Sequence, residues 1–330
     1  MNQKPIVTNM PNEVYHHSME TRQYISSTQL KNYAVSPAYA KYMREHPEAQ
    51  SETPSMQLGS QFHALMEKFV NGMSYEDVEK TYAIFSAPVN PKTLAPYGDS
   101  TAKYQEAYAA FVEANKDKEI ISEKTLDKIM GMAFAIMSHG LNRSLIEFAR
   151  PKADHLKGAE ISFFTELEEG IGAKIRVDAI TSNKVIDWKT TSGNLDPDSL
   201  AKTIINFDYD VSAAFYQYVL YRITGNFYSF YWVFVKNSEP FEATVPVSAE
   251  NFAFATENDM LTFINDEAGE LIFNRGVMRM RAFLNEHIWC TKNDTWPGSE
   301  VFIEPNDKDE RIIAPTCPAW ALANVPKYYN

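Results

Sequence analysis

One stretch of the chain, KIRVDAITSNKVIDWK at residues 174–189, constrains the fold more than any other. Apolar and charged side chains alternate on either side of a short polar run, which is typical of two β-strands joined as a hairpin. A two-residue turn at Ser182-Asn183 would place Asp178 directly opposite Asp187 and put Lys189 on the face of Asp187. In the first strand the alternation separates two sets of three: Ile175, Val177 and Ala179 on one face, and Lys174, Arg176 and Asp178 on the other.

Two carboxylates that face each other on a sheet repel. If they are buried, the pair is tolerable only when it is protonated, ion-paired or bound to a metal. Lys189 supplies one positive charge and cannot satisfy both Asp178 and Asp187, whereas a hard divalent cation such as Mg²⁺ suits two carboxylates. A solvated hairpin face with chance charges is the alternative, and the apolar flanks of both strands argue against it.

The length and composition of the chain set further bounds. A chain of 330 residues with 45% hydrophobic content can bury a large core. No 18-residue apolar run and no signal-peptide pattern is present, so we expect a cytosolic protein without a transmembrane helix. Cys290 and Cys317 are too few for a four-thiolate zinc or iron–sulfur site and are expected to be free thiols. The chain lacks a GxxxxGK[ST] phosphate loop, so no ATP motor is expected.

The formal net charge of −12 argues against non-specific binding to nucleic acid, which usually needs a basic excess or a basic face. Any contact with DNA must therefore be local and assisted by metal ions.

Start signals and periodicity predict a helical first part and a later sheet. Residues 1–24 look irregular, and Ser26, Ser36-Pro37 and Thr53-Pro54 mark helix starts, the last helix running to about Val70. Further helices are predicted near residues 101–115, 122–139, 198–206 and 210–223, with a long helical region over 249–288. Strands are predicted at 160–164, within the hairpin, at 229–235 and at 242–247, before an irregular tail that begins at Asn293 and includes Trp296 and Trp320.

Four residues outside the hairpin are candidates for the same site. Glu160 begins the strand before the hairpin and either completes an acidic cluster or is an ordinary strand-edge carboxylate. His63 lies on a predicted helix one turn after Gly59, and the glycine suggests that another part of the molecule approaches closely. Gln217 and Tyr221 share one helix face at a spacing of four, which is also the spacing of an ordinary aromatic helix face.

The order of these features resembles the RecB-like branch of the PD-(D/E)XK nuclease superfamily. The matching residues are Gly59, His63, Glu160, Asp178, Asp187, Lys189, Gln217 and Tyr221. Over roughly residues 12–325 the chain is more closely similar to the RecE exonuclease (exodeoxyribonuclease VIII) family, which prophages often encode. The stretches that carry this resemblance are residues 25–31 with Ser36-Pro37, 56–59, 174–178, 187–191, Tyr209-Asp210 and 296–298.

The resemblance implies an α/β, restriction-endonuclease-like core, in which helices flank a central mixed β-sheet and additional helical segments lie at both ends. It implies one exonuclease domain over residues 1–330. Within it we expect a mainly helical part at 1–150, the catalytic sheet and helices at 159–247, and a C-terminal helix and coil at 248–330.

The implied activity is Mg²⁺-dependent 5′→3′ digestion of linear double-stranded DNA, with Mn²⁺ as a substitute. The reaction would release 5′-mononucleotides and leave a 3′ overhang for recombination. By resemblance, Asp178, Asp187, His63 and the backbone carbonyl of Trp188 hold one metal, and Glu160 serves a second. Lys189 positions or activates the attacking water. Gln217 and Tyr221 orient the site or hold DNA, while Arg176 contacts phosphate and Lys174 balances the acids.

The resemblance also implies binding partners, an oligomeric state and a cellular location. These are double-stranded DNA ends, a homo-oligomeric ring (a tetramer or trimer) with an acidic exterior, a single-strand annealing protein, and a bacterial or phage-encoded cytoplasmic location. The sequence departs from the family pattern at two places. Val177 stands before Asp178, where the "PD" of the superfamily name has a proline, and residues 306–311 form a charged insertion to which the sequence assigns no role. Another RecB-like repair nuclease, and a non-catalytic DNA-end-binding module on the same fold, are the competing interpretations.

Overall fold

A mixed β-sheet crosses the centre of the molecule in the computed structural model, which describes residues 6–49, 51–152, 156–265 and 274–302 together with Pro305 and Lys308. Its strand order in the described part of the chain is β1-β4-β5-β6-β7-β8, antiparallel throughout except for the parallel pair β6–β7. The strands are β1 (Ile6–Thr8), β4 (Gly158–Glu166), β5 (Gly172–Ile180), β6 (Lys184–Thr191), β7 (Ser229–Lys236) and β8 (Val247–Ser248).

The predicted hairpin is present. Strand β5 ends at Ile180 and β6 begins at Lys184, and the Thr181 amide donates to the Lys184 carbonyl across the turn (N···O 2.9 Å). The side-chain hydroxyl of Thr181 also accepts from the Asn183 and Lys184 amides. These local bonds fix the two-residue turn and with it the register of the two strands.

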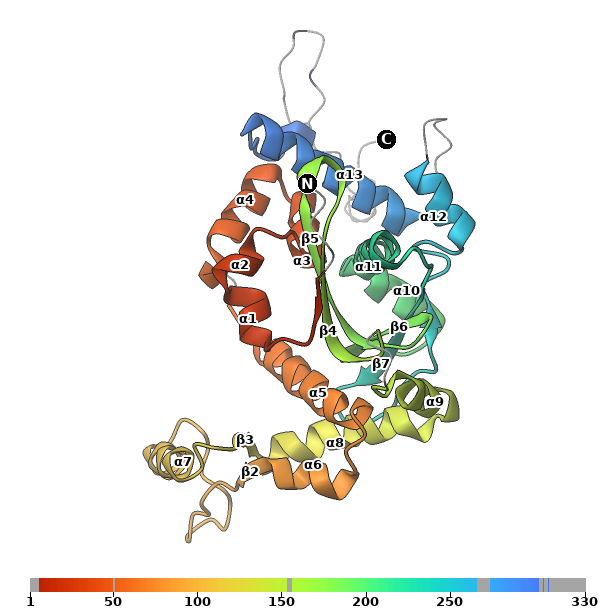
Figure 1. Ribbon diagram of the computed structural model, residues 1–330. Helices are drawn as coiled ribbons and strands as arrows, with labels where there is room; N and C mark the ends of the chain where they lie inside the picture. Colours follow the sequence, from red (N-terminus) through yellow and green to blue (C-terminus); the bar gives the residue numbers. More distant parts are fainter. Residues whose placement is uncertain are drawn as a thin grey trace, which may run out of the picture.

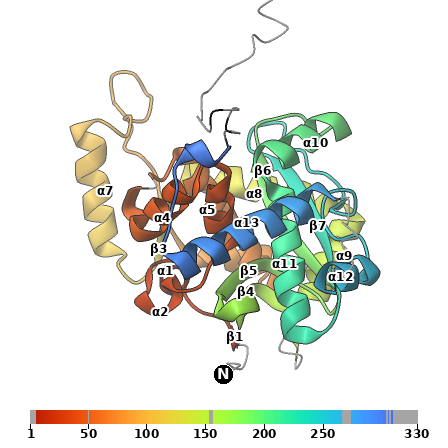
Figure 2. The same cartoon turned by 90° about the horizontal axis from the view of Figure 1, so that it is seen from above.

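Helices cover both faces of the sheet (Figures 1 and 2). One face packs against a first core cluster that includes α3 (Ser27–Lys31), α4 (Pro37–Glu45), α10 (Pro197–Asn206), α11 (Tyr209–Thr224), α12 (Glu257–Ile264) and α13 (Arg275–Asn293). The other face packs against a second cluster with α5 (Pro54–Val70), α6 (Tyr75–Thr81), α8 (Glu123–Ser138) and α9 (Gly140–Ala149). The predicted fold class, a central mixed sheet flanked by helices, is confirmed.

An arm extends from the second cluster, as both views show. It consists of α7 (Ala102–Ala114) and the parallel pair β2 (Tyr82–Phe85) and β3 (Glu119–Ser122). The predicted helix near 101–115 is α7, and residues 86–100, which include Pro88, Pro91 and Pro96, form an irregular loop between β2 and α7.

Several predictions about secondary structure are wrong. Residues 1–24 are not irregular, because they contain β1, α1 (Asn12–His17) and α2 (Met19–Arg22). The region 249–288 is not one helix, because α12 begins only after the capping box of Thr256 and α13 begins after Asn274. The strand expected at 242–247 is reduced to β8 and to a single bridge between Val235 and Ala243.

The predictions for Cys317, Trp320 and most of the charged insertion 306–311 lie outside the described residues. No helix in the described ranges is long and apolar enough to cross a membrane. The division of the chain into one domain with three parts stays a prediction.

Candidate metal centre and active site

Three carboxylates lie in a row across three neighbouring strands. In the ladder between β4 and β5, the pairs on either side of Glu160 and Asp178 are formed, and the register makes these two residues opposite neighbours. The described ladder between β5 and β6 stops one residue short of Asp178 and Asp187, which the same register aligns. The sheet therefore loses its regular pairing where three acids would otherwise meet at close range, as expected from their mutual repulsion.

The backbone is distorted at the same place. Glu160 has a left-handed conformation, with φ of 52°, in the middle of β4. This region is unfavourable for residues other than glycine, and such strain is concentrated at functional sites.

Because of this distortion, side chains two residues apart on β4, and likewise on β5, pack on opposite faces of the sheet. Ile161 and Val177 pack in the first core cluster, whereas Ala159 and Ala179 pack in the second. The prediction that Val177 and Ala179 share a face is wrong, because the break at Glu160 and Asp178 interrupts the alternation of both strands.

Helix α5 brings His63 to this row. The His63 Nε2 donates to the backbone carbonyl of Trp188 (3.0 Å), and its Nδ1 lies 3.4 Å from Asp178 Oδ1 and 4.0 Å from Glu160 Oε1. The Trp188 amide donates to the second carboxylate oxygen of Asp178 (2.8 Å). His63, Glu160 and Asp178 each offer a ligand atom within 4.8 Å of one another, the spacing of a candidate metal site among the described residues.

Gly59, one turn before His63, does lie beside β6. A Cβ built there would be 3.8 Å from the Thr190 Oγ1, which is an ordinary contact. The helix approaches the strand as predicted, but packing within the chain does not require a glycine at this position.

Asp187 has a different partner. Its Oδ2 lies 2.6 Å from the Lys189 ammonium, and it is not part of the three-residue group that the described residues form. Lys189 in turn lies 5.0 Å from the centre of the Tyr209 ring, at the start of α11. The structure thus divides the predicted ligands into a His63–Glu160–Asp178 group and an adjacent Asp187–Lys189 pair.

Burial and neighbouring charges shift the pKa values of the three carboxyl groups in the row. Burial raises the pKa of Glu160 to about 7, with the Asp178 charge adding to the shift, and burial raises the pKa of Asp187 to about 6 against the pull of Lys189. Burial also works to raise the pKa of Asp178, but the neighbouring charge of His63 outweighs it and holds this pKa below its usual value.

The same carboxylates raise the pKa values of the cationic groups His63 and Lys189. Burial opposes the charged form of His63, yet Asp178 raises the pKa of His63 to about 9, and Asp187 raises the pKa of Lys189 above its usual value against a similar burial effect. Three buried or half-buried carboxylates thus lie among His63, Lys189 and Arg176, and burial still raises the pKa of Glu160 and of Asp187. The oxygen and imidazole donors of the site therefore fit a hard divalent cation.

Arg176 and Lys174 face the N-terminal segment. The Arg176 guanidinium donates to Ser162 Oγ (3.0 Å), Asn12 Oδ1 (2.9 Å) and the Met10 carbonyl, and its Nε lies 3.7 Å from Glu160 Oε2. The buried Lys174 ammonium donates to the Tyr15 carbonyl (2.7 Å). Arg176 therefore steadies Glu160 and the N-terminal segment, and its donors are directed into the protein rather than toward solvent.

The predicted pair on α11 is not brought into the acidic row. Gln217 is only 1% exposed, and its Nε2 donates to the carbonyls of Tyr228 (2.9 Å) and Phe254 (3.2 Å). Tyr221 packs at the margin of the first core cluster.

Another α11 residue, Tyr216, is influenced by the charges of the acids, and the sequence reasoning missed it. It hydrogen-bonds with Ser27 of α3, and burial together with nearby charges that include Asp187 and Asp178 raises its pKa well above the ordinary value. The spacing of Gln217 and Tyr221 indicated a shared face, and no sequence signal showed which face turns toward the site.

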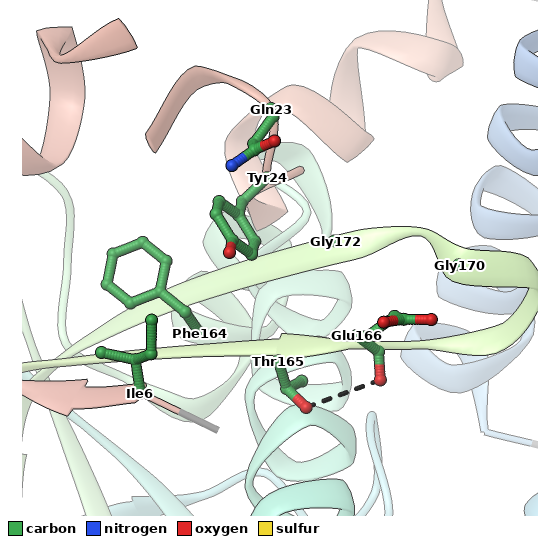
Figure 3. Close-up of a pocket in the computed structure, with 8 residues that line it drawn as sticks. All are labelled: Ile6, Gln23, Tyr24, Phe164, Thr165, Glu166, Gly170 and Gly172. Atoms are coloured by element: carbon green, nitrogen blue, oxygen red, sulfur yellow. Dashed lines mark hydrogen bonds between the residues drawn. The ribbon is translucent and has the colours of Figure 1, made fainter. Parts of the chain in front are cut away.

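A separate pocket lies between the N-terminal segment and the far end of the β4–β5 hairpin (Figure 3). Tyr24, Phe164 and Glu166 line it, and none of the residues of the acidic row does. Its chemistry is therefore distinct from that of the candidate metal centre.

Comparisons with known proteins agree with this geometry. The family described as "PDDEXK-like domain of unknown function (DUF3799)" matches residues 26–299. A crystal structure of a "Putative exonuclease" from Eubacterium rectale superimposes with a TM-score of 0.50 at 12% sequence identity, covering 96% of this chain and 99% of that one. A search of curated proteins finds no match. At this identity the structural likeness shows a shared fold.

Proposed function

This chain belongs to the family of PDDEXK-like domains, with the fold of the PD-(D/E)XK nuclease superfamily, and from that membership we propose that it is a RecE-type exodeoxyribonuclease. It would degrade linear double-stranded DNA from the 5′ end to 5′-mononucleotides and leave a 3′ overhang. The observation that carries the proposal is the row of Glu160, Asp178 and Asp187 across β4, β5 and β6, flanked by His63 and Lys189.

His63, Glu160 and Asp178 would hold a divalent cation, with the Trp188 carbonyl and Asp187 as neighbouring oxygen donors. A bound Mg²⁺ would polarise the scissile phosphate and neutralise charge on its oxygens. Because the pKa of Lys189 is raised, its ammonium stays protonated at neutral pH and acts as a donor. It would orient the attacking water or stabilise negative charge on the phosphate, while Asp187 holds it in place at 2.6 Å.

A matched pair of DNA substrates tests the activity. We expect the purified protein with Mg²⁺ to release labelled mononucleotides from linear duplex that carries a 5′-label, and to leave closed circular duplex of the same sequence intact. Chelation of the metal should stop the release. Cutting of the circle at the rate of the linear form would contradict an exonuclease, and no release from either form would contradict nuclease activity altogether.

His63→Ala should reduce Mg²⁺-dependent hydrolysis by about a hundredfold in a protein that still folds. The substitution removes a candidate ligand, and with it the hydrogen bond to the Trp188 carbonyl and the ion pair with Asp178. His46→Ala, which removes an exposed histidine paired with Glu48, is the control and should leave the rate unchanged. A rate for His63→Ala within about twofold of the parent would assign His63 a structural role.

A further inference from the structure

An exposed aromatic pair lies beside the Asp187–Lys189 pair. Phe207, between α10 and α11, is 60% exposed, and its ring stacks on Tyr209 with centroids 5.5 Å apart and planes 20° from parallel. The Tyr209 ring lies 5.0 Å from the Lys189 ammonium and 5.9 Å from that of Lys31 on α3. The outer face of Phe207 is thus separated from the proposed catalytic lysine by one aromatic ring.

Three charged side chains, Arg275, Arg279 and Lys31, contact the turn that carries Phe207. Asp208 has a left-handed backbone with φ of 50°, a conformation that aspartate adopts more readily than most residues. Its two carboxylate oxygens pair with Arg275 (2.6 Å) and Arg279 (3.0 Å) of α13. The Lys31 ammonium donates to the carbonyl of Phe207 (3.2 Å). The turn that carries the ring is therefore fixed by charged contacts to α13 and to α3.

We propose that Phe207 and Tyr209 form a stacking platform for a nucleobase of the DNA strand whose phosphate lies at Lys189. The inference rests on the proposed nuclease function and adds a specific contact to it.

The chemistry of the platform matches a nucleic-acid strand. Every base presents a π-face that stacks on an aromatic ring irrespective of sequence, and neighbouring cations take the phosphates. Lys31 and Lys189 flank Tyr209 and supply such cations in a chain whose net charge is −12. A local aromatic–cationic contact of this kind is what an acidic protein needs to place one strand at its active site. Lys189 lies near the C-terminal end of β6, and its ammonium is 5.0 Å from the Tyr209 ring, so the platform is at that end of the strand.

The test uses 2-aminopurine, a fluorescent base that is quenched when it stacks. It is placed at the first or second position of the 5′-phosphorylated strand of a linear duplex, and Ca²⁺ replaces Mg²⁺ to slow hydrolysis. We expect the parent protein to quench one of the two probes. Phe207→Ala should abolish this quenching and weaken binding of the duplex about tenfold. Phe207→Trp should retain both properties, and Phe207→Leu, which keeps an apolar side chain on Tyr209, should lose the quenching.

Phe134→Ala is the matched control. Phe134 on α8 is 52% exposed and packs on Tyr75 at 4.8 Å, so its removal exposes a tyrosine in the same way. The inference would be overturned if Phe207→Ala kept its quenching and its affinity within twofold of the parent. It would also be overturned if Phe134→Ala lost both properties to the same extent as Phe207→Ala. Failure of the proposed function is distinguishable, because it would appear as absence of nucleotide release by the unmodified protein in Mg²⁺.

Discussion

Asp178→Asn is expected to abolish DNA hydrolysis, with a loss of about a thousandfold or more in kcat. Asp178 is the middle carboxylate of the row, and one of its oxygens faces His63 while the other accepts the Trp188 amide. The asparagine keeps the shape and an oxygen for that amide, so the fold should survive. The negative charge that would hold a divalent cation is lost.

The measurement is the initial rate of nucleotide release in saturating Mg²⁺, together with the heat of Mg²⁺ binding to the protein alone. Asp198→Asn in the first turn of α10 removes an exposed carboxylate and should change neither quantity. A rate for Asp178→Asn within tenfold of the parent, with Mg²⁺ binding unchanged, would mean that the acidic row is not the metal site.

The second large effect concerns pH. The ionisation of Glu160, Asp187 and His63 should lower the stability of the metal-free protein as the pH rises from about 4 to about 9. Burial raises the pKa of Glu160 to about 7 and that of Asp187 to about 6, and Asp178 raises that of His63 to about 9 although burial opposes it. Each group holds its proton to a higher pH in the folded protein than in the unfolded chain. Unfolding therefore releases protons from these three groups across this window, and their contribution to the free energy of unfolding falls as the pH increases. Burial lowers the pKa of His287 to about 4 and those of Lys31 and Lys174 to about 8, so these groups act in the opposite direction.

Mg²⁺ should reverse this slope, because the cation binds the deprotonated carboxylates and its affinity rises with pH. Thermal unfolding measured from pH 4.5 to 9, with chelator or with Mg²⁺, gives both slopes. One unit of pKa shift corresponds to about 1.4 kcal/mol, so the change should amount to several degrees in Tm. Glu160→Gln should flatten the metal-free slope below pH 7. A metal-free slope in Glu160→Gln equal to that of the parent would contradict the raised pKa of Glu160 in the folded protein.

The sequence predicted the hairpin because its determinants are local. The alternation of β5 and β6 and the polar turn at Ser182-Asn183 set the register, and the register alone aligns Asp178 with Asp187. The helix that carries His63 was equally predictable, since Thr53 caps it and Pro54 begins it.

Features that depend on contacts between distant segments were not predictable. The face reversal near Ala179 follows from a left-handed residue on a neighbouring strand, Glu160. The N-terminal segment has little periodicity of its own, and it is positioned by buried Arg176 and Lys174, more than 150 residues away in the chain. On helix α11 the residue influenced by the charges of the acids is Tyr216, whereas Gln217 binds the carbonyls of Tyr228 and Phe254.

Because the ladder between β5 and β6 ends at the pair Ala179–Ile186, the main chain of Trp188 is available to the side chains of the candidate site. Both main-chain polar groups of Trp188 form hydrogen bonds within the candidate site: its amide donates to Asp178, and its carbonyl accepts from His63. If the site binds a cation as proposed, the Trp188 carbonyl would be a neighbouring oxygen donor, and any amino acid at position 188 supplies that oxygen. Substitution can alter the acids and the histidine one at a time, but the peptide oxygen among them remains as long as the sheet keeps its shape.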